Sequence, residues 1–108
     1  MLKRIDQYLS TCFRRQSPPR VSELARLLEL PLNRFGETFH LATGMTPSAY
    51  LKDRQVGAAK LLLLNTKLSV EKVGHATAFG TRRTFFREFR KCTGTSPAGY
   101  RRRGRNVP

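Results

Sequence analysis

One sequence motif occurs twice in the chain, fifty residues apart, and it limits the possible folds more than any other feature. The motif reads F-x3-F-x3-T-G-x-[ST]-P-x-x-Y and covers residues 35–50 and 85–100. Six of its sixteen positions are identical in the two copies. Self-similarity at a fixed period is the mark of a repeated structural unit. Because there are only two copies, we expect a duplicated motif and not a solenoid.

Each copy has the signals of a helix that stops at a glycine and leads into another helix. In the second copy, Thr81 is a good N-cap because its hydroxyl can accept a hydrogen bond from an unpaired backbone N–H. Phe85, Phe89 and Cys92 follow at helical spacing and mark one buried face. Gly94 occupies the position where helices end in a left-handed residue. The Ser-Pro pair that follows is a typical helix start.

The rest of the chain also shows helical periodicity, and no segment shows the alternation of a strand. The third of the expected helices should bury Leu32, Phe35, Phe39 and Ala42, and Ser69 should cap the fifth. The fold class is therefore predicted to be all-α, with seven helices near residues 2–13, 21–28, 32–42, 47–64, 70–76, 81–92 and from 97 onward.

A short helix, a tight turn and a second helix with a polar outer face make a helix-turn-helix unit. The sequence predicts two such units, over residues 21–42 and 70–92, joined by a long helix. The corresponding division is a first subdomain at 1–45, a linker helix at 46–65, a second subdomain at 66–103 and a basic flexible tail at 104–108. Two units on a rigid connector could enter successive major grooves of a duplex, about 34 Å apart.

The charge of the chain indicates a polyanionic partner. Lysine and arginine number 21 against 7 acidic residues, for a net charge of +14. Such a balance points to nucleic acid, or less often to an anionic membrane surface. The N-terminus lacks the apolar core of a signal peptide, and the longest apolar run is only Leu61 to Leu64. We therefore expect a cytoplasmic protein that does not enter a membrane.

No residue pattern indicates an enzyme, a cofactor or a metal. Cys12 and Cys92 both fall on apolar helical faces, which favours buried, reduced thiols over a disulfide. His40 and His75 have no suitably spaced carboxylates or thiols with which to bind a metal ion. A nucleophile–base pair and a phosphate-binding loop are also lacking. The predicted protein is not an enzyme and uses no cofactor.

The outer faces of two helices are the candidate contacts with nucleic acid. On the sixth helix, Arg82 and Arg83 oppose the positive end of the helix dipole, at a cost of roughly 0.3–1 kcal/mol each. Either an external ligand such as phosphate and base edges favours these arginines, or they are solvated and their cost is screened. The duplication of the motif favours the first interpretation.

The chain resembles the DNA-binding domain of AraC/XylS-type bacterial transcription regulators over residues 2–103. The resemblance rests on V-S-E-L-A at 21–25, the F-x3-F-x4-G-M-T-P-x-x-Y block at 35–50, A-K-x-L-L at 59–63, L-S-V-x-x-V at 68–73 and F-x5-F-x3-F-x3-T-G-x-S-P-x-x-Y-R at 79–101. It implies seven helices, binding to asymmetric promoter sites on double-stranded DNA, and regulation of transcription, usually activation with RNA polymerase as a partner. Many members have a separate N-terminal effector or dimerisation domain. These 108 residues contain none, so we expect either a short stand-alone regulator or the DNA-binding part of a longer one.

The resemblance also implies roles for individual residues. Those implied to read bases are Asn33, Gly36, Glu37 and His40 in the first unit and Arg82, Arg83, Phe86 and Arg87 in the second. Those implied to contact phosphate are Arg34, Arg90, Lys91, Arg101 and Arg102.

Several of these residues have alternative roles. Phe86 could pack on a thymine methyl group or against a neighbouring helix. Glu37 could accept from a cytosine amine, orient a basic neighbour or be solvated. His40 could touch phosphate or be a neutral surface residue, and the arginines from Arg101 onward could bind phosphate or form a solvated tail.

The sequence departs from the family pattern at four positions. The turn glycine before each second helix is replaced by Glu29 and Ala78, so each turn either avoids positive φ or carries strain of about 1 kcal/mol or more. An arginine that is frequent in the long helix is Gln55 here, and Gly36 removes a side chain from the first reading face. The alternative function is a packaging protein that binds nucleic acid by charge alone. It is disfavoured because the two outer faces differ in composition, which suits an asymmetric site read by a monomer.

Overall fold

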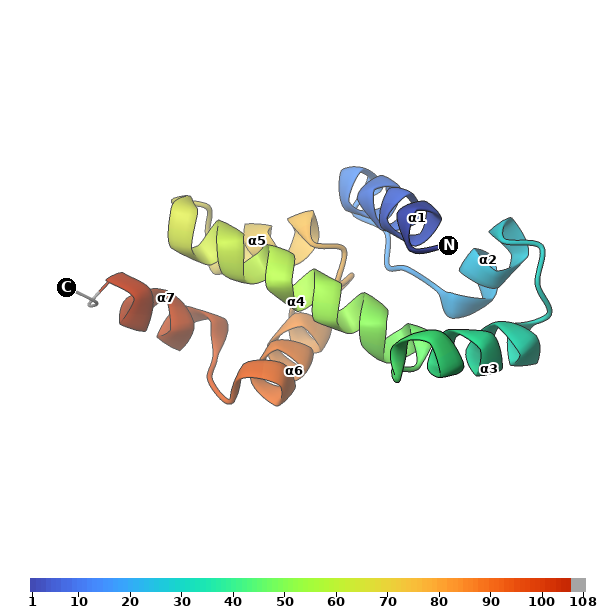
Figure 1. Ribbon diagram of the computed structural model, residues 1–108. Helices are drawn as coiled ribbons and strands as arrows, with labels where there is room; N and C mark the ends of the chain where they lie inside the picture. Colours follow the sequence, from blue (N-terminus) through green and yellow to red (C-terminus); the bar gives the residue numbers. More distant parts are fainter. Residues whose placement is uncertain (106–108) are drawn as a thin grey trace.

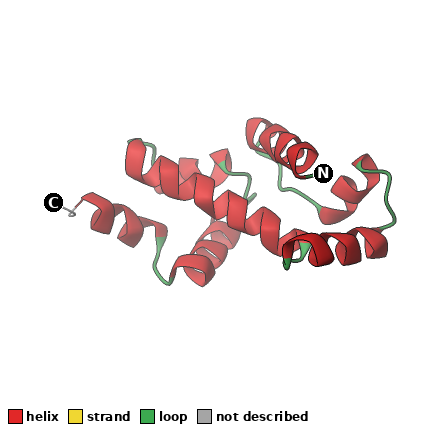
Figure 2. Cartoon of the chain, viewed as in Figure 1, coloured by secondary structure: helices red, strands yellow, loops and turns green. Residues whose placement is uncertain are grey.

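The computed structural model describes residues 1–105, and every regular element within them is a helix (Figures 1 and 2). The predicted all-α class is confirmed. The helices are α1 (Leu2–Arg15), α2 (Val21–Leu27), α3 (Leu32–Thr43), α4 (Pro47–Asn65), α5 (Val70–Ala76), α6 (Arg82–Thr93) and α7 (Pro97–Arg105). We call α2 with α3 the first unit and α5 with α6 the second unit.

The connector α4 runs through the middle of an elongated molecule that measures 45 × 27 × 23 Å. In Figure 1, α1, α2 and α3 lie at one end of α4, and α5, α6 and α7 lie at the other. The helices α3 and α6 are both on the lower side of this view, whereas α1 and α5 are on the upper side. The second helix of each unit therefore lies in the lower half of this view.

Each end of the molecule has its own hydrophobic core. The first is built around Phe35, Phe39 and Leu51, with Ile5 and Leu9 of α1. The second is built from Val56, Ala59, Leu63, Val73, Phe79, Phe85 and Phe89. Because α4 contributes to both cores, it fixes the two units relative to each other.

The two ends also meet directly. Ala78, in the turn of the second unit, is fully buried in the first core, and α1 contacts α5. Gly80 lies so close to the loop between α1 and α2 that a Cβ on Gly80 would be 2.8 Å from Cγ of Pro18. The second unit is therefore seated against the first as well as on α4.

The repeated motif forms the same structure twice. The rings of Phe35 and Phe39 are 5.9 Å apart and those of Phe85 and Phe89 are 5.7 Å apart, both edge to face. The tyrosine that closes each copy packs on the second phenylalanine, at 5.3 Å and 5.5 Å. The hydroxyl of each motif threonine donates to the carbonyl four residues earlier, at 2.8 Å in both copies. The identical phenylalanines and tyrosines thus hold α3 to α4 and α6 to α7.

The two turns have the same backbone path, and neither uses glycine. Glu29 has φ 58° and Ala78 has φ 63°, so both residues adopt the left-handed conformation. In each turn the next N–H closes the helix end, from Leu30 to the carbonyl of Ala25 (3.0 Å) and from Phe79 to that of Gly74 (3.2 Å). The sequence left open whether these turns avoid positive φ or carry strain, and both turns carry the strain. Its cost is about 1–2 kcal/mol per residue.

Side chains cap the starts of α4, α5, α6 and α7, and the predicted caps Ser69, Thr81 and Ser96 are among them. Side-chain oxygens of Thr46, Ser69 and Thr81 accept from the N–H groups of Ala49, Lys72 and Thr84, each at 3.1 Å. Ser96 does the same for Gly99 at 3.0 Å. These contacts satisfy N–H groups that the first turn of a helix leaves without partners.

Three residues predicted to be buried are exposed. Leu32 is 54% exposed, and Ala42 and Cys92 are exposed as well. The apolar stripe of each helix extends one turn beyond the edge of the core, so residues three positions outside the phenylalanine pair reach solvent. Ala42 and Cys92 occupy equivalent positions of the two copies, and the prediction was wrong at both for this reason.

The prediction of a flexible tail at 104–108 was wrong for its first two residues. Gly104 and Arg105 are the last residues of α7 and are therefore helical. Residues 106–108, which belong to the same predicted tail, lie outside the described part of the chain.

Candidate nucleic-acid interface

The first candidate surface is the outward face of α3, formed by Asn33, Gly36, Glu37 and His40. Phe35 and Phe39 are fully buried and fix the rotation of the helix about its axis. Asn33, Glu37 and His40 consequently face solvent, and Gly36 is partly exposed. The N-cap of α3 is Pro31, which makes no side-chain cap. This face carries one acidic residue, Glu37, and no arginine.

The second candidate surface is the outward face of α6. Burial of Phe85 and Phe89 turns Arg82, Arg83 and Arg87 toward solvent. Phe86 is partly buried, with its ring 5.9 Å from that of Phe85 and edge to face. The Arg82 guanidinium lies over the Phe86 ring, 4.8 Å from its centroid. The two residues thus support each other, and the attraction of a cation to a ring is worth about 0.5–1 kcal/mol at an exposed site.

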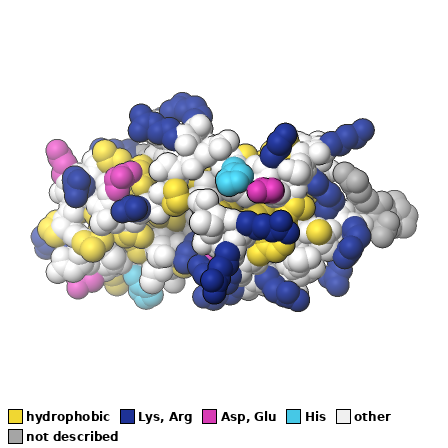
Figure 3. All heavy atoms as spheres, turned by 180° about the vertical axis from the view of Figure 1, so that it is seen from behind, with side chains coloured by type: hydrophobic (Ala, Val, Ile, Leu, Met, Phe, Trp, Pro, Cys, Tyr) yellow, Lys and Arg dark blue, Asp and Glu magenta, His cyan; other side chains and the backbone are white. Residues whose placement is uncertain are grey.

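Basic side chains are concentrated in the second half of the molecule. Residues 1–45 contain seven lysines and arginines and four acidic residues, whereas residues 66–103 contain ten and two. In Figure 3, dark blue side chains gather at the lower middle of the molecule and toward the right, and the magenta side chains lie mainly toward the left. The positive potential of the molecule is therefore strongest around α6 and α7.

The residues predicted to contact phosphate have two different environments. Arg34, Arg90, Lys91 and Arg102 are exposed. A groove of about 410 Å³ between α6 and α7 is lined by Arg90, Arg102 and Arg103 together with the loop at residues 94–96. Arg101 points elsewhere, because its guanidinium donates to the carbonyls of Leu63 (3.0 Å) and Thr66 (3.4 Å) at the end of α4. In this structure Arg101 therefore caps the end of α4, whereas Arg102 and Arg103 line the groove.

Comparisons with known proteins place this geometry in a family. A family model described as a helix-turn-helix domain matches residues 24–103. The arabinose operon regulatory protein of Escherichia coli is 31% identical over 81 residues, which are 75% of this chain and 28% of that protein. The virulence regulon transcriptional activator VirF of Yersinia enterocolitica is 29% identical over 79 residues, 73% of this chain and 29% of that protein. The chain belongs to the AraC/XylS-type helix-turn-helix family.

A solved structure agrees with this assignment. The DNA-binding domain of the global transcriptional factor AdpA, solved in complex with a target DNA, superposes with a TM-score of 0.81 at 26% identity. The alignment covers 93% of this chain and 91% of that one. The chain spans less than a third of the length of the curated relatives it matches.

Sequence reasoning missed Glu88 and Lys52, which lie beside Arg87 of this AraC-type domain, and it did not foresee the contacts of Gln55. Glu88 is 5% exposed, and its Oε1 lies 3.5 Å from both Lys52 Nζ and Arg87 Nε. Gln55 is buried, and its Nε2 donates to the carbonyls of Thr77 (3.0 Å) and Ala78 (3.1 Å) in the second turn. One signal was available for Glu88, because it is the only acidic residue between Arg82 and Lys91. Gln55 could be singled out only as a departure from the family.

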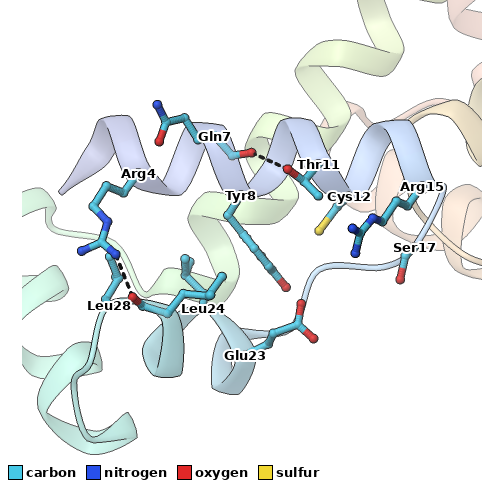
Figure 4. Close-up of a pocket in the computed structure, with 11 residues that line it drawn as sticks. Arg4, Gln7, Tyr8, Thr11, Cys12, Arg15, Ser17, Glu23, Leu24 and Leu28 are labelled. Atoms are coloured by element: carbon cyan, nitrogen blue, oxygen red, sulfur yellow. Dashed lines mark hydrogen bonds between the residues drawn. The ribbon is translucent and has the colours of Figure 1, made fainter.

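A cleft of about 460 Å³ lies between α1 and α2 and is lined by none of the predicted reading residues (Figure 4). Tyr8 crosses it, and its hydroxyl accepts from the N–H of Arg20 at 2.9 Å. Burial raises the pKa of the Cys12 thiol, so this cysteine is a poor nucleophile.

None of the helices within residues 1–105 combines the length and apolar character needed to cross a membrane. Within residues 1–105 there is no group of three or more His, Cys, Asp or Glu side chains placed to hold a metal ion.

Proposed function

We propose that this domain binds double-stranded DNA sequence-specifically and as a monomer, with α3 and α6 in successive major grooves on one side of the duplex. The observation that carries the proposal is the pair of exposed, unlike faces on one duplicated scaffold. The 45 Å length of the molecule can accommodate the roughly 34 Å between successive major grooves. Because the two faces differ, the preferred site should be asymmetric.

The biological role that we propose is activation of transcription in the bacterial cytoplasm, with RNA polymerase as a partner and without enzymatic activity. VirF is by its name a transcriptional activator, which supports this direction of regulation. The curated relatives are more than three times as long as the matched region, so the proposal concerns DNA binding by the matched region alone.

We propose residue roles that the geometry supports. Arg83 and Arg87, on one face of α6, are suited to bidentate bonds with the O6 and N7 atoms of guanine, each worth about 1–3 kcal/mol of discrimination. The groove formed by Arg90, Arg102 and Arg103 is suited to a backbone phosphate. Glu37, the acidic residue on the α3 face, would accept from a cytosine amine.

The test is selection of preferred duplexes from a random pool, followed by competition binding at a stated salt concentration. We expect an asymmetric site with two blocks of preference about one helical turn apart, bound at least tenfold more tightly than random DNA. A gain of less than tenfold would contradict sequence-specific reading. In that case a steep salt dependence, with equal losses for every Arg→Ala change, would indicate packaging by charge.

A further inference from the structure

We propose that Glu88 is a positioning residue for Arg87, held in place by Lys52 of the connector helix, and that this arrangement sets base preference in the second unit. The inference rests on the proposed function, because it concerns how one predicted reading side chain is oriented. It adds two residues, one on the connector and one below the reading face, to the determinants of specificity.

The position of Glu88 needs an explanation. It is a carboxylate with a side chain only 7% exposed, placed under the most basic surface of the molecule. Burial of a charge is costly unless it is paired, and a well-packed apolar residue would stabilise the fold as well or better. A negative charge here also opposes phosphate. Neither stability nor DNA affinity accounts for a glutamate at this position.

The contacts of Glu88 suggest what it contributes. Its Oε1 lies 3.5 Å from Lys52 Nζ, which comes from α4, and 3.5 Å from Arg87 Nε, which is next to it on α6. Within residues 1–105 these are the only ion pairs. Lys52 therefore anchors the carboxylate to the connector, and the carboxylate faces one edge of the guanidinium.

The geometry leaves the reading edge of Arg87 available. Only Nε bonds to Glu88, and the Arg87 side chain is 60% exposed. The two terminal amino groups are the fork that recognises guanine O6 and N7. An arginine held at Nε loses less side-chain freedom when it binds, so the orientation should favour the matching base over others.

Glu88→Gln tests this, because it keeps the shape of the side chain and removes the charge. We expect binding to random DNA to tighten by about two- to fivefold, since one opposing charge is lost. Preference at one base pair of the selected site should instead fall by about three- to tenfold. Glu71→Gln, at an exposed position of α5, is the matched control, because it changes the net charge equally and should leave the preference unaltered.

A double variant separates positioning from general effects. In an Arg87→Ala background, Glu88→Gln should cause no further loss of preference at that base pair. An equal loss in both backgrounds, or an unchanged preference in the single variant, would overturn the proposal.

Lys52→Met provides a second route, which also serves if Glu88→Gln fails to fold. It should lower the same base preference while weakening binding to random DNA, the opposite sign to Glu88→Gln. An unaltered preference profile for Lys52→Met would contradict the anchoring step.

If the wild-type chain selects no site at all, the proposed function fails. If it selects a site and neither variant alters the preference, only this inference fails.

Discussion

The outward faces of α3 and α6 differ at every equivalent position, although both inward faces are built on the same pair of phenylalanines. Asn33 corresponds to Arg83, Gly36 to Phe86, Glu37 to Arg87 and His40 to Arg90. The inward residues repeat as the same phenylalanines, with ring separations that agree within 0.2 Å. The two copies have therefore kept the same phenylalanine packing, whereas their exposed side chains differ in charge and size. We expect the second unit to supply most of the electrostatic affinity, and the first to add contacts that depend less on charge.

The largest effects should come from the part that the two units share. Phe35→Ala and Phe85→Ala each remove a fully buried ring, which should lower the free energy of unfolding by about 3–5 kcal/mol. Because Ala78 lies in the first core and Gly80 packs on Pro18, we expect both variants to unfold in a single transition. Chemical denaturation followed by circular dichroism and by amide NMR signals from each unit would measure this.

Leu61→Ala is the control for the core variants, since Leu61 is 63% exposed and its loss should change stability by less than about 0.5 kcal/mol. A Phe35→Ala variant that keeps the NMR signals of α5 and α6 while losing those of α3 would show that the two units fold independently.

The second prediction concerns the turns, which are held in different ways. Gln55 donates from the buried face of α4 to the carbonyls of Thr77 and Ala78, whereas exposed Arg4 donates to the Leu27 carbonyl near the first turn, at 2.8 Å. Gln55→Leu should cost about 1–3 kcal/mol, because buried carbonyls lose a donor. Gln55→Arg, which restores donors and the residue frequent in the family, is the control. Thermal denaturation would compare them, and equal stabilities of Gln55→Leu and wild type would contradict the role of Gln55.

Much of this fold could be predicted from the sequence because its signals are local. Caps such as Thr81 and Ser96, the glycines that end α3 and α6, and the phenylalanine pairs each act within one or two helical turns. These local signals were enough to predict the helices and the repeated motif. The limits of the cores are not local, which is why Leu32 and Cys92 were assigned to the interior. Whether a stripe of apolar residues is covered at its end depends on where the neighbouring helix stops.

The candidate site was predictable in part for the same physical reason. Helical spacing identified the exposed residues of α3 and α6, because burial of the phenylalanines determines which side faces out. It could not identify contacts between elements far apart in the chain. Glu88 meets Lys52 across 36 positions and Arg101 meets Leu63 across 38, and no periodicity relates such pairs. These contacts give Arg87 a neighbour and turn Arg101 toward α4.

The third prediction separates the two faces by salt dependence. On the selected site, Arg83→Ala should lose about 1–3 kcal/mol of binding free energy and reduce the slope of log K against log salt by about 0.9 if its charge displaces one counterion. Asn33→Ala at the equivalent position should lower preference for its base and leave the slope unchanged, since asparagine carries no charge. Titrations at four or more salt concentrations would measure both. A reduced slope for Asn33→Ala would contradict the division of roles between the units.

The smallest effect concerns Gly36, which occupies the position of Phe86 in the other unit. Glycine within a helix costs about 0.5–1 kcal/mol relative to alanine, and a Cβ at Gly36 would have no atom within 4 Å, so Gly36→Ala should stabilise the domain by that amount. Gly57→Ala in α4 meets the same open space and should give the same gain, which makes it the control. If the backbone of α3 approaches DNA closely at Gly36, the added methyl group should weaken binding to the selected site, while Gly57→Ala should leave binding unaltered. Equal affinities of the two variants would show that the first unit does not use close approach. In that case the contrast between Gly36 and Phe86 would reflect only the absence of a contact on α3.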